Sequence, residues 1–406
     1  MSLEMPHNGQ NEAPTSSAAL RAMRLERTLA ALLSHGALSR TELAEITGYS
    51  RSSMTATIRE LMTAGFVRET GLSESTGGRR RTILQFNRPG VYLSLVSVEG
   101  LYLTVSQIDM LGTVQAQLRR RLDRDEPLAS LEAALRALHE VVEQPSRCVV
   151  VSLPGVVSAE GEVSLAPALG LAPVRGLRDA LGSALGLPVL VENDVNLLVL
   201  GESAAGAAQM VDDVVLLYVG EGIGAALLFG GRVHRGATGS AGEVGFLPWE
   251  GVMPASTSSV GPLEANWSAN ALAQCAAALG IEAEDRSILA ALQASSLPEA
   301  AALLEGAVAA WAYAAVVNAC IVNPELVVFA GEAVHLPAAA QAELAARVKA
   351  AAPAPVEVAF ARLGDRAIAQ GAIAFIETRP RLVFAFDEEE VPGLSGDGSW
   401  QERGTD

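Results

Sequence analysis

Apolar residues recur at every third or fourth position in three consecutive segments near the N-terminus, and this spacing predicts three short helices. The first helix is expected over Leu20–Ser34. Ser39 and Glu42 have the spacing of a capping box, which predicts that a second helix begins there. Ser50 is expected to cap a third helix over Arg51–Ala64. The side chains expected to face inward are Leu43, Ala44 and Ile46 in the second helix and Met54, Ile58, Leu61 and Met62 in the third.

The opposite face of the third predicted helix carries short polar and basic side chains, which suit a helix that reads base edges in the major groove. These side chains are Arg51, Ser52, Ser53, Thr55 and Arg59. Two strands are predicted at 66–69 and 82–86, and the glycine-rich loop between them could clamp phosphates or enter a minor groove. The arginines of this loop are Arg79, Arg80 and Arg81. We therefore expect a winged helix-turn-helix domain over residues 20–88, with a helical protein-interaction module as the alternative.

Beyond residue 89, strand-like apolar runs alternate with helical segments, which predicts an α/β body of two lobes with a ligand cleft between them. The strongest predicted strands are Leu93–Val98, Arg147–Leu153, Pro188–Glu192, Val214–Val219 and Leu326–Ala330. The predicted helices include Pro127–Glu143, Pro298–Cys320 and Asp365–Glu377. The first lobe is expected over residues 89–200 plus 365–382, and the second over residues 201–364. No internal repeat is evident in the sequence.

A glycine-rich stretch, Tyr218–Leu247, is the most distinctive part of the second lobe. Residues 220–224 are expected to turn between two strands, because glycine accepts positive φ and lets the backbone approach a ligand. Backbone N–H groups in such a turn suit a phosphate, but the carboxylate of Glu221 would repel one. The sequence therefore leaves two interpretations open, a nucleotide-binding loop and a β-hairpin with glycine corners.

Charge is distributed unevenly along the 406 residues, whose formal net charge is −17. Residues 1–90 hold 11 arginines and 8 acidic residues, whereas the remainder holds 18 basic and 38 acidic residues. A basic head on an acidic body is typical of a DNA-binding module joined to another domain. Residues 1–19 and the acidic residues 383–406 are expected to be flexible tails.

Three scattered cysteines, Cys148, Cys275 and Cys320, fit neither a disulfide framework nor a zinc site, so no metal site is expected. No apolar run is expected to span a bilayer, and the first residues lack the pattern of a signal peptide. These features predict a cytoplasmic protein without membrane contact, bound metal or cofactor.

Several motifs of the body, taken together and in order, resemble those of the ROK family, which contains bacterial sugar kinases and sugar-responsive repressors. The motifs are Pro154-Gly155-Val156-Val157, Glu192-Asn193-Asp194-Val195-Asn196, Gly201-Glu202, Gly220-Glu221-Gly222-Ile223-Gly224, Gly242-Glu243-Val244-Gly245, Gly261-Pro262-Leu263-Glu264 and Asn323-Pro324-Glu325. The resemblance covers residues 20–380 and implies an α/β, two-lobed actin-like or hexokinase-like body of the ribonuclease H-like ATPase type. The predicted N-terminal winged helix implies the repressor branch of that family.

The resemblance also implies roles for four polar residues. Family kinases use the aspartate that matches Asp194 to take a proton from the attacking sugar hydroxyl, and repressors keep it to hydrogen-bond the sugar. Asn193, Glu243 and Glu264 would be further partners of sugar hydroxyls, through matched hydrogen bonds of the kind that give specificity. From its position before Val195, Asp194 could also be the N-cap of a helix.

Two departures from the family pattern speak against catalysis. Where family kinases have an Asp-x-Gly-Gly-Thr phosphate loop, this chain has Ser97-Val98-Glu99-Gly100-Leu101, and Glu221 replaces the usual threonine of the second loop. Two carboxylates would repel a triphosphate. The zinc ligands of the family are also missing, because Phe246 takes the histidine position and Gly251–Pro262 contains no cysteine.

These observations favour a DNA-binding transcriptional regulator that represses carbohydrate-related genes and has no catalytic residue. A homodimer or homotetramer would bind a pseudo-palindromic operator in double-stranded DNA. A sugar or sugar phosphate would act as effector between the lobes, with a pocket that has lost ligand binding as the alternative. The competing functions are a ROK-type sugar kinase with an accessory DNA-binding head and a scaffold for a transport or signalling protein.

Overall fold

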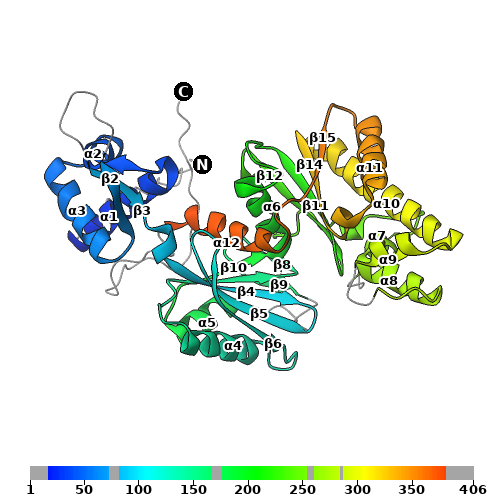
Figure 1. Cartoon of the computed structure of the whole chain (residues 1–406), viewed down its shortest axis with the longest axis horizontal. Coiled ribbons are helices and arrows are strands. Elements are labelled where there is room, and N and C mark those ends of the chain that lie inside the picture. Colours follow the sequence, from blue (N-terminus) through cyan, green and yellow to red (C-terminus); the bar gives the residue numbers. More distant parts are fainter. Residues whose placement is uncertain (1–16, 73–81, 167–175, 254–259, 284–286, 381–406) are drawn as a thin grey trace, which may run out of the picture. The chain divides into compact units, whose positions relative to one another are not determined.

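The computed structural model describes residues 17–72, 82–166, 176–253, 260–283 and 287–380 (Figure 1). The described residues form two compact units. The chain up to Val91 forms the first together with the residues from Glu377 onward, and Tyr92–Ile376 form the second. The predicted wing arginines, which are Arg79, Arg80 and Arg81, lie outside the described residues, as do most of the two predicted tails.

The first unit is a winged helix-turn-helix, in which three helices precede a β-hairpin. Its elements are α1 (Ser17–His35), β1 (Leu38–Ser39), α2 (Arg40–Thr47), α3 (Arg51–Thr63), β2 (Val67–Leu72) and β3 (Thr82–Phe86). The strands form an antiparallel sheet in the order β1-β3-β2. Because α1 begins at Ser17, earlier than the predicted start at Leu20, residues 17–19 belong to this helix and not to the predicted flexible tail.

Both predicted helix caps of the first unit are confirmed. The Ser39 hydroxyl accepts a hydrogen bond from Glu42 N at 3.3 Å, and Ser39 N donates to Glu42 Oε2 at 2.7 Å, which completes the capping box. Ser50 Oγ accepts from Ser53 N at 3.2 Å and caps α3. Each cap satisfies a backbone donor that the first turn of a helix leaves unpaired, so both helices begin at defined residues.

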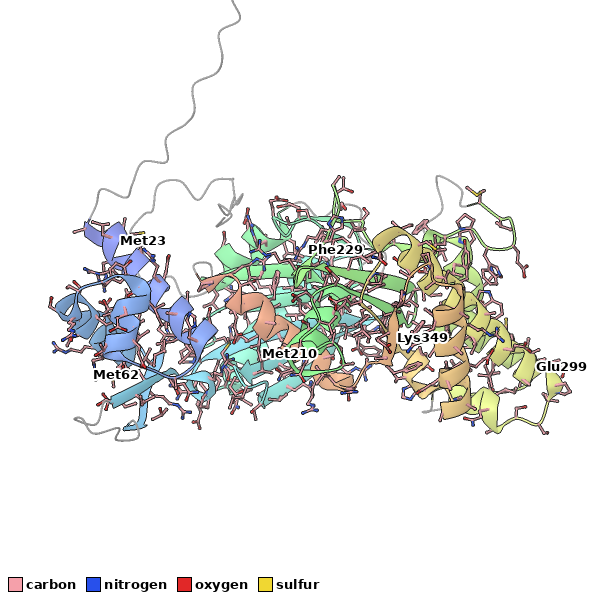
Figure 2. The ribbon with its side chains drawn as sticks, turned by 90° about the horizontal axis from the view of Figure 1, so that it is seen from above. Met23, Met62, Met210, Phe229, Glu299 and Lys349 are labelled. Carbon is pink, nitrogen blue, oxygen red and sulfur yellow. The ribbon has the colours of Figure 1, made fainter. Side chains whose placement is uncertain are left out.

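The inward faces of α2 and α3 differ in part from the prediction. The predicted inward residues that are fully buried are Leu43, Met54, Ile58 and Leu61. Ile46 and Met62 are instead 46% and 36% exposed, and Figure 2 shows Met62 at the surface of this unit. Thr47 and Thr57 take the inward positions. Their hydroxyls donate to backbone carbonyls one turn earlier, so no polar atom is left unpaired by burial.

The second unit contains two five-stranded sheets with the same strand order. The first sheet, ordered β6-β5-β4-β7-β10, contains β4 (Tyr92–Glu99), β5 (Tyr102–Asp109), β6 (Val114–Arg121), β7 (Val149–Leu153) and β10 (Val189–Asn193). The second sheet, ordered β13-β12-β11-β14-β15, contains β11 (Val214–Val219), β12 (Ile223–Phe229), β13 (Arg232–Val233), β14 (Leu326–Gly331) and β15 (Glu357–Phe360). In each sheet, the first three strands in the chain pair in antiparallel fashion, and the last two strands run parallel to the first strand. This actin-like repeat was not evident in the sequence, because different side chains build the same topology.

Helices cover the two sheets. The leucines of α4 (Pro127–Val141) and α5 (Leu177–Leu185) share one core with the first sheet. The helices that share a core with the second sheet are α7 (Pro262–Trp267), α8 (Ala269–Ala278), α9 (Ile288–Ala294), α10 (Pro298–Val322) and α11 (Ala338–Ala351). A small hairpin of β8 (Val156–Val157) and β9 (Val163–Leu165) follows β7. The sequence did not predict β8, β9, β15, α7 or α11, because these elements are short or, in α11, rich in alanine without clear periodicity.

Two helices of the second unit, α6 (Asp194–Ala205) and α12 (Ala367–Glu377), cross at glycine residues. A Cβ added to Gly371 would lie 1.9 Å from Leu197 O, and one added to Gly201 would lie 2.2 Å from Ala367 O. These distances leave no room for a side chain, so the two backbones are in direct contact. The crossing fixes α6, and with it the side chains at its N-terminus, against α12.

The helix α10 is long and apolar enough to cross a membrane by length and composition, contrary to the prediction that no segment could. Trp311 of this helix is fully buried, and its indole Nε1 donates to Trp267 O at 3.1 Å. Ala310 and Ala314 are fully buried in the same core. Packing against the second sheet and neighbouring helices therefore explains the apolar composition of α10.

Candidate functional site

The outer face of α3 presents most of the predicted DNA-reading side chains to solvent. The exposed members of the set are Arg51, Ser52, Thr55 and Arg59. Met54 and Ile58 lie on the opposite side of the helix, in the core of the first unit. No ion pair among the described residues engages Arg51 or Arg59. Both guanidinium groups are therefore available to a ligand such as a base edge or a phosphate.

Two hydroxyls of this set also have local hydrogen bonds. Ser53 is half-buried, and its Oγ accepts from Ser50 Oγ at 3.0 Å. Thr55 Oγ1 donates to Arg51 O at 2.9 Å. Each hydroxyl has a donor and two acceptor lone pairs, so Thr55 can still accept a hydrogen bond from a base without breaking its own contact.

One basic residue of the β2–β3 hairpin was not among the predicted DNA contacts. Arg68 lies on β2 and is exposed, in the strand that leads into the loop containing the predicted wing arginines. Its position on a strand of the predicted hairpin was the signal that could have identified it. Arg68 thus adds an exposed cation to the β2–β3 hairpin, where it pairs with Gln85.

In the second unit, Asn193 and Asp194 lie where β10 becomes α6. Asn193 is the N-cap of α6, because its Oδ1 accepts from Asn196 N at 2.9 Å. Its Nδ2 donates to Gly155 O at 2.9 Å and to Asp194 Oδ1 at 3.2 Å. The alternative that Asp194 caps the helix is therefore wrong. Asp194 is the first helical residue, and its Oδ1 accepts from Val195 N at 2.9 Å.

The carboxyl group of Asp194 lies in an acidic environment. Burial raises the pKa of Asp194 to about 7, and the charges of Glu243 and Glu99 contribute to the rise. Hydrogen bonds from backbone N–H groups oppose the shift but do not cancel it. A carboxyl group that holds a proton near neutral pH can both donate and accept hydrogen bonds, as a sugar hydroxyl requires.

Glu243 and Glu264 lie on two segments that pack near the β11–β12 turn. Glu264, on α7, is half-buried, and its Oε2 accepts from Ile223 N at 3.0 Å. Gly222 and Gly245 approach it so closely that a Cβ on either would lie 2.8 Å from that oxygen. Glu243 keeps contact with solvent, yet partial burial raises the pKa of Glu243, with the charge of Glu264 adding to the rise. Burial also raises the pKa of Glu264.

Tyr218, on β11, lies against two glycine-containing turns. A Cβ on Gly220 would lie 2.5 Å from the Tyr218 hydroxyl oxygen, and one on Gly331 would lie 2.9 Å from Cε2 of its ring. Burial raises the pKa of Tyr218 to about 12, and nearby carboxylates add to the rise. Those carboxylates belong to Asp194, Glu99, Glu221 and Glu332. The surroundings of this tyrosine are therefore acidic.

The two turns that match the phosphate loops of family kinases meet directly. A Cβ on Gly100, in the β4–β5 turn, would lie 3.0 Å from Glu221 Oε1 in the β11–β12 turn. Glu99, next to Gly100, is exposed like Glu221. The β11–β12 pair is an antiparallel hairpin, as one of the two interpretations expected. Two carboxylates thus border the space in which a kinase would need to hold a triphosphate, and they would repel it.

An aromatic cluster lies next to the start of the segment that matches the zinc-binding segment of the family. Trp249 packs edge-on against Trp267 and Tyr313, with ring centroids 5.9 Å and 5.7 Å apart. Glu250 and Gly251, which follow it, both have positive φ, at 49° and 78°. Over the described part of the chain, no group of His, Cys, Asp or Glu side chains is placed to hold a metal ion. Aromatic packing therefore holds Trp249 against α7 and α10.

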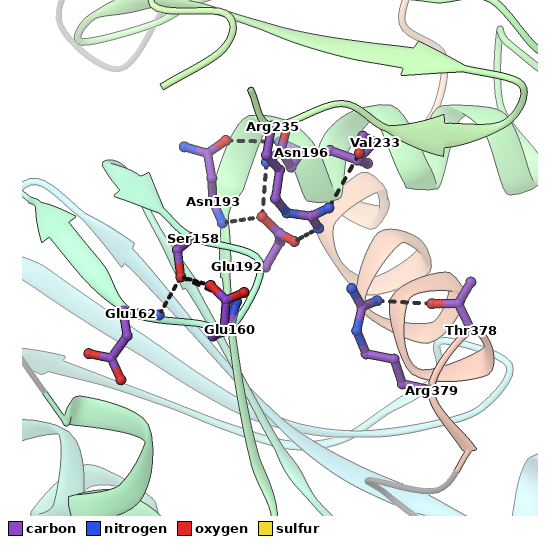
Figure 3. Close-up of polar contacts among 10 residues, drawn as sticks. All are labelled: Ser158, Glu160, Glu162, Glu192, Asn193, Asn196, Val233, Arg235, Thr378 and Arg379. Carbon is purple, nitrogen blue, oxygen red and sulfur yellow. Dashed lines mark hydrogen bonds and ion pairs between the residues drawn. The ribbon is translucent and has the colours of Figure 1, made fainter. Parts of the chain in front are cut away.

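A buried ion pair between Glu192 and Arg235 was not predicted (Figure 3). Glu192 is 1% exposed, and its Oε1 accepts from Asn193 N and Asn196 Nδ2, both at 2.9 Å. The side chain of Arg235 is 14% exposed. One signal was present, because an acidic residue in an otherwise apolar strand needs a cation or several donors when it is buried.

Together, the fold and these sites define a winged-helix protein with an actin-like body of the sugar-kinase type. A model of the ROK family matches residues 102–379, and the chain therefore belongs to the ROK family. A model of the MarR family matches residues 27–81, within the winged helix-turn-helix unit.

Relatives of known function include two bacterial regulators. The xylose repressor of Bacillus subtilis is 24% identical over 222 residues, which cover 53% of this chain and 58% of the relative. The DNA-binding transcriptional dual regulator NagC of Escherichia coli is 26% identical over 222 residues, which cover 53% of this chain and 55% of the relative. In both comparisons, the chain spans just over half the length of the relative.

Solved structures with a similar fold include a regulator and a kinase. A ROK family transcriptional regulator, described as a homologue of the Escherichia coli MLC protein, superimposes with a TM-score of 0.75 at 23% identity over 90% of this chain and 98% of that one. A ROK glucokinase from Streptomyces griseus, in complex with glucose and AMPPNP, gives a TM-score of 0.57 at 22% identity over 70% and 98% of the two chains. At these identities, both similarities establish the fold alone.

Proposed function

We propose that this protein is a sequence-specific DNA-binding transcriptional regulator that represses carbohydrate-related genes. The observation that carries the proposal is the exposed outer face of α3, with Arg51, Ser52, Thr55 and Arg59, in a winged helix-turn-helix unit. A helix in this position of the fold enters the major groove with its N-terminal residues on base edges. The names of the two curated relatives support the same function.

Selection of binding sites from a pool of random DNA duplexes tests this proposal. We expect the full-length chain to enrich a pseudo-palindromic site, because a homodimer or homotetramer presents two recognition helices related by a two-fold axis. Half-sites should be about one helical turn, or a multiple of it, apart. A pool that shows no enriched sequence after several rounds would contradict the proposal.

The second unit is proposed to bind a sugar-like effector through Asn193, Asp194, Glu243 and Glu264. These side chains supply several acceptors, and Asp194 supplies a donor when it is protonated. Such groups suit a ligand rich in hydroxyls, since matched hydrogen bonds to buried polar groups give specificity. The acidic surroundings favour a neutral sugar over a sugar phosphate, which the carboxylates would repel.

The effector would control DNA binding by shifting the protein between two conformations. It can do so only to the extent that it binds one conformation more tightly than the other. A screen of neutral sugars and sugar phosphates by thermal shift identifies such a ligand, because binding to the native state raises the melting temperature. We expect a neutral monosaccharide to give the larger shift.

A ROK-type sugar kinase is the second candidate function. It is favoured by the retention of Asp194 at the position of the catalytic aspartate and by the fold shared with a glucokinase. It is disfavoured by the contact between Glu221 and the β4–β5 turn. Measurement of ATP consumption with a panel of sugars separates the two functions. Turnover that is abolished by Asp194→Asn would establish the kinase.

A further inference from the structure

One loop of the second unit makes contacts on both sides, with the second sheet and with the residues around the end of the first. This bridging loop, residues 234–242, leaves the second sheet after β13. A Cβ on Gly239 would lie 2.5 Å from Val157 O of β8, so the loop touches the hairpin that follows the first sheet. A Cβ on Gly242 would lie 1.9 Å from Ala225 O of β12, so the loop returns to the second sheet at its end.

Arg235 anchors the bridging loop to the last residues of β10 (Figure 3). Its Nη2 pairs with Glu192 Oε2, and its Nη1 donates to Val233 O at 3.3 Å. Arg235 Nε is buried and makes no hydrogen bond to any residue that the structure describes. Glu192 is the carboxylate that forms an ion pair with this guanidinium group among the described residues, and the charge of Arg235 also acts on Glu160 nearby. A buried charge that loses its partner is strongly destabilised, so the pair resists separation.

One partner of this ion pair adjoins a proposed effector residue in the chain, and the other lies on the loop that leads to a second one. Glu192 precedes Asn193, and its Oε1 accepts from Asn193 N at 2.9 Å. At the other end, the bridging loop leads directly into Glu243. Gly242 O accepts from Ala225 N at 2.7 Å, which ties this end of the loop to β12. A displacement of Arg235 would therefore be transmitted to Glu243 along the bridging loop, which close contacts hold at Gly239 and at Gly242.

We propose that Arg235 and Glu192 are positioning residues of the effector site, which set the place of Glu243 relative to Asn193 and Asp194. The inference rests on the proposed effector function of those residues. The ion pair contributes no atom to the ligand. It holds the bridging loop on the first sheet, so that acceptors from the two sheets face one ligand at a constant separation.

Amide hydrogen exchange of the full-length chain without ligand tests this role. In Arg235→Met, we expect the amides of Ala225 and Val244, which donate to Gly242 O, to exchange at least about tenfold faster than in the wild type. Amides at the centre of β11 should keep their wild-type rates. Glu192→Gln should give the same pattern. Arg235→Lys keeps the positive charge, so the amides of Ala225 and Val244 should exchange more slowly in it than in Arg235→Met. It also provides a second variant for the test if Arg235→Met does not fold.

Arg178→Met is the matched control variant. Like Arg235, Arg178 acts on the carboxylate of Glu160, and its Nη1 donates to the backbone carbonyl of Glu160 at 2.6 Å. Its ion pair is with Asp179, and none of its hydrogen bonds among the described residues reaches the bridging loop. It should leave the two reporting amides unchanged. Wild-type rates at Ala225 and Val244 in Arg235→Met would overturn the proposal. A uniform acceleration that includes the centre of β11 would also overturn it, because it would show a loss of global stability alone.

A second measurement relates the ion pair to ligand binding. D-glucose, D-xylose and N-acetyl-D-glucosamine are titrated into the wild type and Arg235→Met by calorimetry. A sugar that binds the wild type should bind the variant at least about tenfold more weakly, and equal affinity would overturn the inference. If none of the three sugars binds the wild type, the effector part of the proposed function fails for them, and the exchange rates alone decide the role of the ion pair.

Discussion

Glu221 Oε1 lies 3.0 Å from the position that a Cβ would take on Gly100, so the β11–β12 turn meets the β4–β5 turn. With Glu99 beside them, two carboxylates border this contact. We predict that Mg²⁺ and ATP leave the melting temperature of the wild-type chain unchanged, because the carboxylates repel a triphosphate. Differential scanning fluorimetry checks this, and an ATP-dependent rise in melting temperature would contradict it.

Asp194 is predicted to make folding stability depend on pH. Its pKa rises from the ordinary value of 3.8 to about 7, so the folded state binds the proton more tightly than the unfolded state does. The contribution of this group to stability is therefore full below pH 3.8 and is lost as the pH rises through about 7. Asp194→Asn removes the ionisation. At about pH 8 the free energy of unfolding should be larger for the variant than for the wild type by about 1–2 kcal/mol. This difference is smaller than the full pKa shift would give, because Asp194 keeps some contact with solvent.

Urea unfolding at about pH 8 and about pH 5 measures this difference. The advantage of Asp194→Asn should shrink at the lower pH, where the wild-type carboxyl group is mostly protonated. Asp212→Asn is a suitable control, because Asp212 is exposed and lies outside the effector site. If Asp194→Asn exceeded the wild type in free energy of unfolding by the same amount at both pH values, the carboxyl group of Asp194 would not titrate in this range.

Glu202 is predicted to be the most stabilising acceptor at the end of α6. It is fully buried, and its Oε1 accepts from Arg362 N at 3.0 Å and Leu363 N at 2.9 Å, while its Oε2 accepts from Ala207 N at 2.6 Å. Glu202→Gln places an amide donor against at least one of these N–H groups. We expect a loss of about 2–3 kcal/mol in the free energy of unfolding. The exposed Glu305→Gln on α10 should change it by less than about 0.5 kcal/mol.

Local chemistry allowed much of the first unit to be predicted. Ser39 and Glu42 determine a helix start through contacts within one turn, and such contacts depend only on spacing in the sequence. The inward face of the same helices was harder to predict. Thr47 and Thr57 were overlooked because a polar side chain is buried only when it finds a partner, and here each finds a carbonyl of its own helix.

The effector site could be predicted only in part. Resemblance to a family directed attention to Asn193 and Asp194, but the N-cap role belongs to Asn193. The ion pair between Glu192 and Arg235 could not be predicted, since the two residues are far apart in the sequence and meet only when the bridging loop touches the first sheet. Pairwise contacts of this kind depend on how two sheets are packed, which no local pattern encodes.

The predicted wing arginines are expected to bind DNA without regard to sequence. Arg79→Ala combined with Arg80→Ala should weaken binding to all duplexes and reduce the slope of log K against log salt by about 2, since each phosphate contact contributes about 0.9. Fluorescence anisotropy at several salt concentrations measures the slope. Arg120→Ala with Arg121→Ala, which removes two exposed arginines of β6, should leave the slope unchanged. An unchanged slope in the wing variant would exclude the wing from DNA binding.

The exposed arginines of α3 are expected to discriminate between sequences. Arg51→Ala should cost about 1–3 kcal/mol of binding to the selected duplex, because a bidentate contact to a base is lost, and should weaken binding to a scrambled duplex less. The ratio of the two dissociation constants would then fall by about tenfold or more. Glu45→Ala on α2, an exposed position outside the predicted reading face, should leave the ratio unchanged.

Recognition of a DNA sequence through the winged helix-turn-helix unit is measured by the ratio of dissociation constants for the scrambled and selected duplexes. The ratio is determined for the wild-type chain at one physiological salt concentration. We expect a ratio of at least about 10³ in favour of the selected duplex. Equal dissociation constants for the two duplexes would contradict it.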